Sequence, residues 1–414
     1  MRILHLGCFT SSVIIKLPRV SSTTTAAAPL SSIRFFSFQP SFTKQRQFSL
    51  RTSPKRFMCS GGDKRNFPEV ISTAISSLNT NVAPFMSAEL RKLYGGVPDE
   101  DLIKNQVDNY YLPMFSYLKL LLDMKTEANT PGPLFIGISA PQGCGKTTMT
   151  DMIRAVFAEE GKRAVALSLD DFYLTGQEQE QLAATEKTND LPNELLKLRG
   201  NAGTHDLNLL NNTMSELKAT KKDLRLPRYD KSLRSGKGDR APIDSWDLVN
   251  DDVGGNVDIV LFEGWMLGFD PLDTVMNGDM TAVNKYLQHP GYGDLHSVFD
   301  AWIVVALKDI NYVFDWRLDA EKRMIKSGKP GMSDDDVRDF VNRFMPAYRT
   351  YLPRLHQVGV GPQPRKPWLF SDAGSKVDIL KNLAPTVTTD ISVPAPVLKV
   401  SIDQKRLPID VSLL

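Results

Sequence analysis

Residues 135–148 read FIGISAPQGCGKTT, and the rest of the chain is organised around this stretch. Its first residues are apolar, as in a buried strand, and Pro141, Gly143 and Gly145 then introduce a turn. Apolar side chains recur at positions 149, 152, 153, 156 and 157, which lie on one face of a helix. The stretch therefore predicts a strand, a glycine-rich loop and a helix in direct succession.

This succession is typical of a phosphate-binding P-loop. Glycines let backbone N–H groups surround an anion, and the helix N-terminus adds unpaired donors and the positive end of its dipole. Lys146 is expected to reach the β- and γ-phosphates of ATP, and the Thr147 hydroxyl to ligate Mg²⁺. The expected nucleotide contacts are Ala140, Pro141, Gln142, Gly143, Cys144, Gly145, Lys146, Thr147 and Thr148.

One position departs from the usual pattern G-x-x-x-x-G-K-[ST], because Ala140 replaces the first glycine. Alanine fits there only if its φ angle is negative. The alternative is a chance Gly-Lys-Thr in an ordinary loop. The strand before the loop and the amphipathic helix after it favour the P-loop.

The first 60 residues differ in composition from the rest of the chain. They contain no Asp or Glu, nine Lys or Arg, and many Ser and Thr. This composition is typical of a plastid or mitochondrial transit peptide, and the dominance of Ser and Thr over Arg favours the chloroplast stroma. The alternative is a disordered basic tail. We expect residues 1–60 to be a cleaved transit peptide.

The charge and the apolar runs of the chain argue against two classes of partner, and its cysteines leave one candidate thiol. Without those nine positive charges, the formal charge of +2 becomes −7 for residues 61–414. This acidic balance, without a basic stripe, argues against a nucleic-acid partner. No apolar run reaches the length of a membrane span, so no membrane partner is expected. Cys144 alone follows residue 60; its helix N-terminal position favours a thiolate, while the simpler interpretation is an ordinary small loop residue.

The remaining pattern predicts an α/β fold of the P-loop NTPase type, a parallel sheet flanked by helices. Buried strands are predicted at 135–139, 164–169, 258–263 and 301–307. Residues 61–130 indicate a helical preface packed on a P-loop domain at 131–356. Residues 357–414 are Pro-rich, and 397–402 is a candidate last strand, expected at a sheet edge because of the prolines before it.

Acidic residues stand at the carboxyl ends of two predicted strands, where open α/β sheets place their chemistry. Asp170 and Asp171 follow the second strand, and neighbouring strand residues point to opposite sides, so only one can easily face the phosphates. The alternative for this pair is a turn or a helix cap. Glu263 ends the third strand and is the expected carboxylate at Mg²⁺, together with Thr147.

Two clusters of basic and hydroxylated residues lie in the polar segment 174–250, where we expect no clear strand. They suit a small anionic, hydroxylated substrate, although each charge taken singly is more often a solvated surface residue. The candidates are Arg199, Thr204, His205, Tyr229 and Lys231. Beyond residue 310, two amphipathic helices carry Arg317 and suit a helical lid that closes on phosphate; a plain helical hairpin fits nearly as well.

Five segments together resemble the plant D-glycerate 3-kinases, in the P-loop kinase group of phosphoribulokinase, uridine kinase and bacterial-type pantothenate kinase. The segments are GISAPQGCGKT (137–147), SLDDFY (168–173), RGNAGTHD (199–206), PRYDK (227–231) and FEGW (262–265). The resemblance implies an ATP-dependent kinase that phosphorylates D-glycerate to 3-phosphoglycerate, the closing step of photorespiration in the chloroplast. It also implies that Asp170 is the general base.

The catalytic residues expected on this basis are Lys146, Asp170 and Arg317, with ATP and Mg²⁺ as cofactors and a small molecule as the partner. One alternative is a P-loop kinase for another small alcohol, of the uridine, pantothenate or ribulose-phosphate type. Another is a P-loop ATPase or GTPase that is not a kinase. The GTPase is disfavoured because the sequence has no Asn-Lys-x-Asp run.

Overall fold

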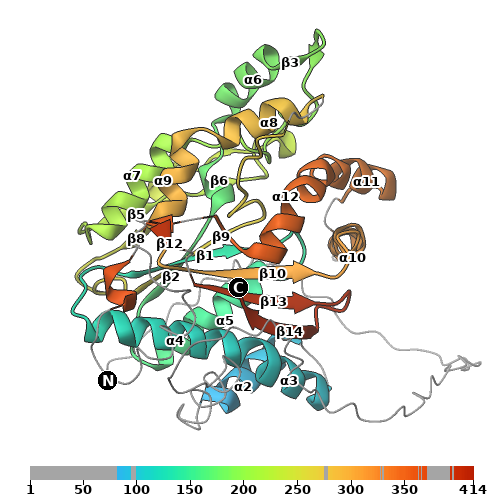
Figure 1. The fold of residues 1–414 in the computed structure, drawn as a ribbon. Helices are drawn as coiled ribbons and strands as arrows, with labels where there is room; N and C mark the ends of the chain where they lie inside the picture. Colours follow the sequence, from blue (N-terminus) through green and yellow to red (C-terminus); the bar gives the residue numbers. More distant parts are fainter. Residues whose placement is uncertain are drawn as a thin grey trace, which may run out of the picture. The chain divides into compact units, whose positions relative to one another are not determined.

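A six-stranded sheet forms the centre of the structure, which is a computed structural model (Figure 1). Along the sheet the strand order is β14-β13-β10-β1-β9-β2. Five of these strands, β1, β2, β9, β10 and β13, are parallel, and β14 runs antiparallel at one edge. The strands are β1 (Leu134–Ser139), β2 (Ala164–Ser168), β9 (Ile259–Gly264), β10 (Ala301–Leu307), β13 (Val397–Ile402) and β14 (Pro408–Leu413). The predicted parallel α/β sheet is confirmed.

The structure describes residues 82–94, 99–274, 278–326, 328, 331–361, 363–364, 366–370, 392–393 and 396–414. All of them belong to one compact unit, residues 52–414. The expected transit peptide at 1–60 lies outside the described residues, and so does the first part of the helical preface, 61–81.

The strand order reverses at β1, which lies between β9 and β10. From β1 the chain continues through α5 (Lys146–Glu159) to β2, and β9 later pairs between these two strands. It then returns to the other side of β1 to form β10 and β13. Ligands of open α/β sheets bind beside the carboxyl ends of strands at such a reversal. The P-loop therefore opens where the topology favours a ligand.

The strands alternate their side chains between two apolar clusters, one on each face of the sheet. Ile136 and Ile138 of β1 pack with α5 and with four N-terminal segments. Those segments are α2 (Val82–Tyr94), α3 (Glu100–Gln106), a π-helical turn (Val107–Tyr111) and α4 (Leu112–Glu127). Phe262 of β9 and Trp302 of β10 pack on the opposite face with α7 (Leu207–Lys218), α9 (Pro290–Val298) and α12 (Met345–Val358). Because both faces are covered, the central strands are mostly apolar, and β10 (AWIVVAL) is apolar throughout.

Four further α-helices and several short strands complete the described fold. The helices are α6 (Gly176–Thr185), α8 (Met280–Leu287), α10 (Tyr312–Lys326) and α11 (Asp334–Asn342). Within the fully described segment 174–250 no strand exceeds three residues, as expected from its polar sequence. Its strands are β3 (Lys187–Thr188), β4 (Leu191–Pro192), β5 (Leu224–Leu226), β6 (Tyr229–Asp230), β7 (Asp239–Arg240) and β8 (Asp247–Val249). Near the C-terminus β11 (Gln363–Pro364) pairs with β12 (Ser392–Val393).

The C-terminal strand exists, but its predicted position is wrong. β13 pairs with β10 on one side and with β14 on the other, so it is internal, and β14 forms the edge. Proline excludes only its own N–H from a ladder, and the prolines in question precede the strand. The Pro396 carbonyl even accepts a hydrogen bond from Trp302 N–H at 2.9 Å.

A buried ion pair joins the start of the sheet to the N-terminal helices. Asp300 precedes β10 and accepts hydrogen bonds from Lys125 Nζ and from Phe135 N–H, each at 3.0 Å. Lys125 also donates to the Pro133 carbonyl at 2.7 Å. Both charged side chains are less than a tenth exposed. Removal of one partner would leave the other charge buried without compensation.

We expect Asp300→Ala to lower the free energy of unfolding by about 3–5 kcal/mol. Urea denaturation followed by circular dichroism measures the change. Asp294→Ala, at an exposed position of α9, is the control and should change the value by less than about 0.5 kcal/mol. A similarly small effect of Asp300→Ala would show that the ion pair does not stabilise the fold.

Candidate active site

The P-loop connects β1 to α5 at the carboxyl end of the sheet. Gly143 and Gly145 have φ angles of 82° and 99°, in the left-handed region that favours glycine. Ala140 is fully buried and is absent from the described residues that have positive φ. The condition under which alanine was expected to fit this position is therefore met.

The backbone of this loop offers free hydrogen-bond donors. Among the described residues, none accepts a hydrogen bond from the N–H of Gly143 or Gly145. No atom lies within 4 Å of the point where a Cβ on Gly145 would stand, so the space beside it is open. The first turn of α5, which starts at Lys146, adds N–H groups without intrahelical partners. These donors suit an anion such as a phosphate.

Lys146 and Glu263 meet beside the loop. Glu263 pairs in register with Ile138 of β1 and with Ser168 of β2, and its Oε2 lies 3.9 Å from Lys146 Nζ. Burial raises the pKa of Glu263, and Lys146 opposes this effect. Burial would lower the pKa of Lys146, but Glu263, Cys144 and Asp170 together outweigh burial and the pKa is raised. Lys146 is thus a fixed positive charge next to the phosphate-binding loop.

Glu263 and Thr147 have the donor atoms that Mg²⁺ binds. Glu263 Oε2 is buried and accepts no hydrogen bond from a described residue. Thr147 is exposed in the first turn of α5, and no described hydrogen bond uses its hydroxyl. The described residues contain no group of three or more His, Cys, Asp or Glu that could hold a metal ion. Two oxygen ligands fit Mg²⁺, which usually keeps several waters and binds substrate phosphates.

The side chains of Asp170 and Asp171 have different partners, as predicted for this pair. The predicted reason, alternation along a strand, is wrong. β2 ends at Ser168, and the two aspartates lie in a 3-10 turn, Leu169–Phe172. Asp171 accepts hydrogen bonds from Ser168 N–H at 3.3 Å, from Arg228 at 2.9 Å and from Tyr229 N–H at 3.2 Å. Asp171 therefore has the capping role that the sequence left open for the pair.

Asp170 has a different set of contacts. It accepts hydrogen bonds from the Tyr173 hydroxyl at 2.8 Å and from Lys231 Nζ at 2.6 Å. Burial would raise the pKa of Asp170, but Lys231, Lys146 and the Tyr173 hydroxyl outweigh it and hold the pKa below its usual range. The carboxylate is therefore ionised at neutral pH, as a proton acceptor has to be.

Aromatic rings extend from this carboxylate into segment 174–250. Tyr173 stacks on His205 with ring centroids 4.9 Å apart, and it meets the edge of Tyr229 at 5.4 Å. The Arg199 guanidinium lies 5.7 Å from the centroid of the Tyr229 ring. The structure thus brings together four of the five residues predicted to bind substrate: Arg199, His205, Tyr229 and Lys231.

Thr204, the fifth, uses its hydroxyl within the protein, and its predicted substrate contact stays a prediction. It is fully buried, and its hydroxyl donates to the Asn201 carbonyl at 2.8 Å. The same hydroxyl accepts from the Gly200 N–H at 3.0 Å. These bonds stabilise the turn that carries His205.

Arg317 lies within the helix pair α10–α11. It forms an ion pair with the buried Glu321, and its guanidinium stacks 4.9 Å from the centroid of the Phe340 ring. No contact among the described residues joins Arg317 to the P-loop, to Asp170 or to Glu263. In this structure Arg317 holds the helix pair together, and its catalytic role stays a prediction.

The C-terminal hairpin contacts the P-loop, which the sequence analysis did not identify. Arg406, in the turn between β13 and β14, donates from Nε to the Gly143 carbonyl at 2.7 Å. Its guanidinium lies 4.9 Å from the centroid of the Trp316 ring of α10. Trp316 in turn donates from Nε1 to the Gln404 carbonyl at 2.7 Å. No motif signals this contact, because it depends on how the hairpin packs.

We expect Arg406→Gln to weaken ATP binding about three- to tenfold, because the P-loop loses a charged hydrogen bond that holds Gly143. Titration calorimetry with ATP and Mg²⁺ measures the Kd. Lys405→Gln, an exposed neighbour in the same turn, is the control and should leave the Kd unchanged. Equal Kd values for the two variants would mean that the hairpin does not support the nucleotide site.

Cys144 is an ordinary buried residue of the loop. Burial raises the pKa of its thiol to about 11, although Lys146 opposes the shift. The thiol is therefore protonated at neutral pH, and the simpler of the two sequence interpretations is supported.

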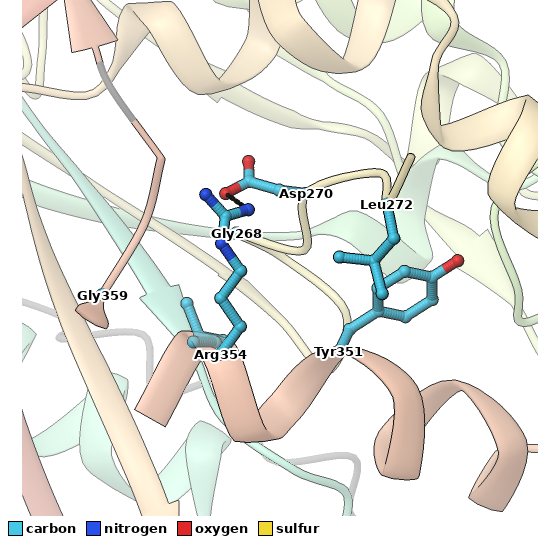
Figure 2. Close-up of a pocket in the computed structure, with 7 residues that line it drawn as sticks. Gly268, Asp270, Leu272, Tyr351, Arg354 and Gly359 are labelled. Atoms are coloured by element: carbon cyan, nitrogen blue, oxygen red, sulfur yellow. Dashed lines mark hydrogen bonds and ion pairs between the residues drawn. The ribbon is translucent and has the colours of Figure 1, made fainter. Parts of the chain in front are cut away.

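A separate hollow lies between loop 268–272 and α12 (Figure 2). Figure 2 shows Asp270 and Arg354 pointing toward one another, with an ion pair at 2.8 Å. Tyr351 and Leu272 line the same hollow. Neither the P-loop nor Asp170 nor Glu263 contributes to its lining, so we assign no phosphate chemistry to it.

No described helix has both the length and the apolar character needed to span a membrane.

Known kinases are similar to this chain. The model of the Phosphoribulokinase / Uridine kinase family matches residues 135–277, a range that contains the P-loop, Asp170 and Glu263. The chain is 42% identical over 267 residues to the chloroplastic D-glycerate 3-kinase of Arabidopsis thaliana, covering 62% of this chain and 57% of that protein. It is 36% identical over 260 residues to the uncharacterized kinase mug58 of Schizosaccharomyces pombe, covering 59% of this chain and 91% of that protein.

A solved structure supports the same relationship. The D-glycerate 3-kinase from Cryptococcus neoformans aligns with a TM-score of 0.54 and 28% sequence identity. The alignment covers 73% of this chain and 99% of that one. The similarity thus extends over nearly all of the fungal protein, beyond the P-loop motif alone.

Proposed function

Because the chain belongs to the phosphoribulokinase / uridine kinase family of P-loop kinases, we propose that it transfers the γ-phosphate of ATP to the 3-hydroxyl of D-glycerate, giving 3-phosphoglycerate. Two relatives named D-glycerate 3-kinase support this substrate. The chain matches 57% of the length of the plant relative, so the substrate is part of the proposal.

The pairing of Asp170 with Lys231 carries the proposal. Asp170 is the proton acceptor for a substrate hydroxyl, and Lys231, 2.6 Å away, is a cation for a substrate carboxylate. A hydroxy acid satisfies both groups with one small molecule. An uncharged acceptor such as uridine cannot draw Lys231 away from Asp170, so this pair favours an anionic substrate.

Substrate binding has to rearrange this pair. Both oxygens of Asp170 are engaged, one by Tyr173 and the other by Lys231. When a substrate carboxylate draws Lys231 away, one Asp170 oxygen becomes free to take the hydroxyl proton. Tyr173 still holds the carboxylate in place. The substrate carboxylate thereby prepares the base.

The remaining residues bind and stabilise the phosphates. The P-loop N–H groups and Lys146 hold the β- and γ-phosphates and stabilise the charge of the transferring group. Thr147 and Glu263 would hold Mg²⁺, which neutralises phosphate charge when bound. The α10–α11 pair is the proposed lid, and it excludes water from the reacting groups when it closes.

A coupled assay for ADP release tests the proposal. It uses the purified chain with ATP, Mg²⁺ and a panel of D-glycerate, glycerol, lactate, uridine, pantothenate and ribulose 5-phosphate. We expect turnover with D-glycerate. Glycerol lacks the carboxylate and lactate lacks the 3-hydroxyl, so both should be poor substrates. Faster turnover of any other alcohol in the panel would overturn the substrate assignment while leaving the kinase assignment intact.

We also propose that the protein acts in the chloroplast stroma, where glycerate phosphorylation would serve photorespiration. The acid-free, Ser-rich residues 1–60 and the chloroplastic plant relative support this location. A fluorescent protein fused behind residues 1–60 tests it. Fluorescence confined to the cytosol would contradict the proposal.

A further inference from the structure

A chain of hydrogen bonds behind the aromatic rings ends at an unpaired nitrogen. The Gly203 N–H donates to the Tyr292 hydroxyl at 3.1 Å, and this hydroxyl lies 2.9 Å from His205 Nδ1. His205 Nε2 is buried and has no hydrogen-bond partner in the described part of the chain. Tyr292 is 3% exposed and His205 is 5% exposed, so water does not freely replace these partners.

These hydrogen bonds determine which imidazole nitrogen of His205 holds the proton. Because the Tyr292 oxygen already accepts from Gly203, its own proton is available to His205 Nδ1. In the reverse arrangement Nδ1–H would donate to Tyr292, and the buried hydroxyl proton would have no acceptor, which is costly. Burial lowers the pKa of His205 to about 4, so the ring is neutral at pH 7. A neutral ring whose Nδ1 accepts carries its proton on Nε2.

The ring that carries this Nε2–H lies against a residue beside the proposed base. His205 stacks on Tyr173, with an angle of 23° between the ring planes, and Tyr173 donates to Asp170. The charge of Asp170 also acts on the imidazole. A buried donor without a partner is unfavourable until a ligand accepts its hydrogen bond.

We propose that His205 presents Nε2–H as a fixed donor to an oxygen of the acceptor substrate, and that Tyr292 fixes this tautomer. This proposal rests on the proposed function. Tyr292 is then a positioning residue that acts through His205. Its role is the orientation and protonation of the imidazole, separate from the transfer of the phosphoryl group.

Two kinds of measurement on the full chain test this. Long-range ¹H–¹⁵N spectra, assigned with His205→Gln, should show His205 protonated on Nε2 in the unchanged protein. In Tyr292→Phe both tautomers should be populated, and the KM for D-glycerate should rise about tenfold with the KM for ATP unchanged. Tyr286→Phe is the control. The Tyr286 ring also packs against Gly203, but its hydroxyl donates to Glu186 and not to His205.

The His205 variants add a test that survives a folding defect in Tyr292→Phe. Gln places an amide N–H near the position of Nε2, whereas Asn places one nearer Nδ1, so His205→Gln should retain tighter glycerate binding than His205→Asn. A proton on Nδ1 in the unchanged protein would overturn the inference, as would equal KM values in Tyr292→Phe and Tyr286→Phe. The tautomer is read without turnover, so a failure of the substrate assignment is distinguishable from a failure here.

Discussion

Lys146→Ala is expected to lower kcat on the order of a thousandfold, to the limit of detection, while the fold stays intact. The lysine is the positive charge of the P-loop, and removal of one preorganised group at developing charge has an effect of this size. Its closest anionic contact is Glu263 Oε2 at 3.9 Å, and it makes no described hydrogen bond to the core. The loss should therefore fall on phosphate binding and transfer.

The measurement is the coupled assay at saturating ATP, together with thermal unfolding of the same preparations. Lys104→Ala is the control, because Lys104 forms only an exposed ion pair with Asp108 on the surface of the N-terminal helices. It should leave kcat and the unfolding temperature unchanged. Near-normal turnover in Lys146→Ala would refute the P-loop assignment.

The parts of the site that were predicted from the sequence depend on local structure. Residues 135–157 form strand, loop and helix in succession, so the P-loop and the position of Lys146 follow from neighbouring residues. Glu263 was placed by one further inference, that a strand ending in an acid joins the same parallel sheet. Its register with Ser168 and Ile138 confirms that inference.

The parts that were not predicted depend on contacts between distant segments. Asp171 pairs with Arg228, 57 residues further along the chain, in addition to its local cap at Ser168. Arg406 reaches Gly143 only because β14 folds back along β13. Residue chemistry selected the candidate side chains, while the contacts that each of them makes in the fold depend on tertiary packing.

Asp170→Asn should lower kcat by about a hundred- to ten-thousandfold, the usual cost of losing a positioned general base. Asparagine has nearly the same shape and still accepts a hydrogen bond from the Tyr173 hydroxyl, so the site should keep its geometry. The KM for ATP should change little, because the P-loop and Lys146 remain in place. This pattern is the one expected when a group acts only in the transition state.

Asp171→Asn is the matched comparison, because it removes the neighbouring charge with the same change in shape. Asp171 caps the 3-10 turn and pairs with Arg228, so its loss should lower the unfolding temperature and reduce kcat by less than about tenfold. Both variants are assayed side by side at saturating Mg²⁺, with thermal unfolding of each. If Asp171→Asn abolishes turnover and Asp170→Asn remains active, the base is Asp171, and the hydrogen bonds from Ser168, Arg228 and Tyr229 then serve to orient a catalytic carboxylate.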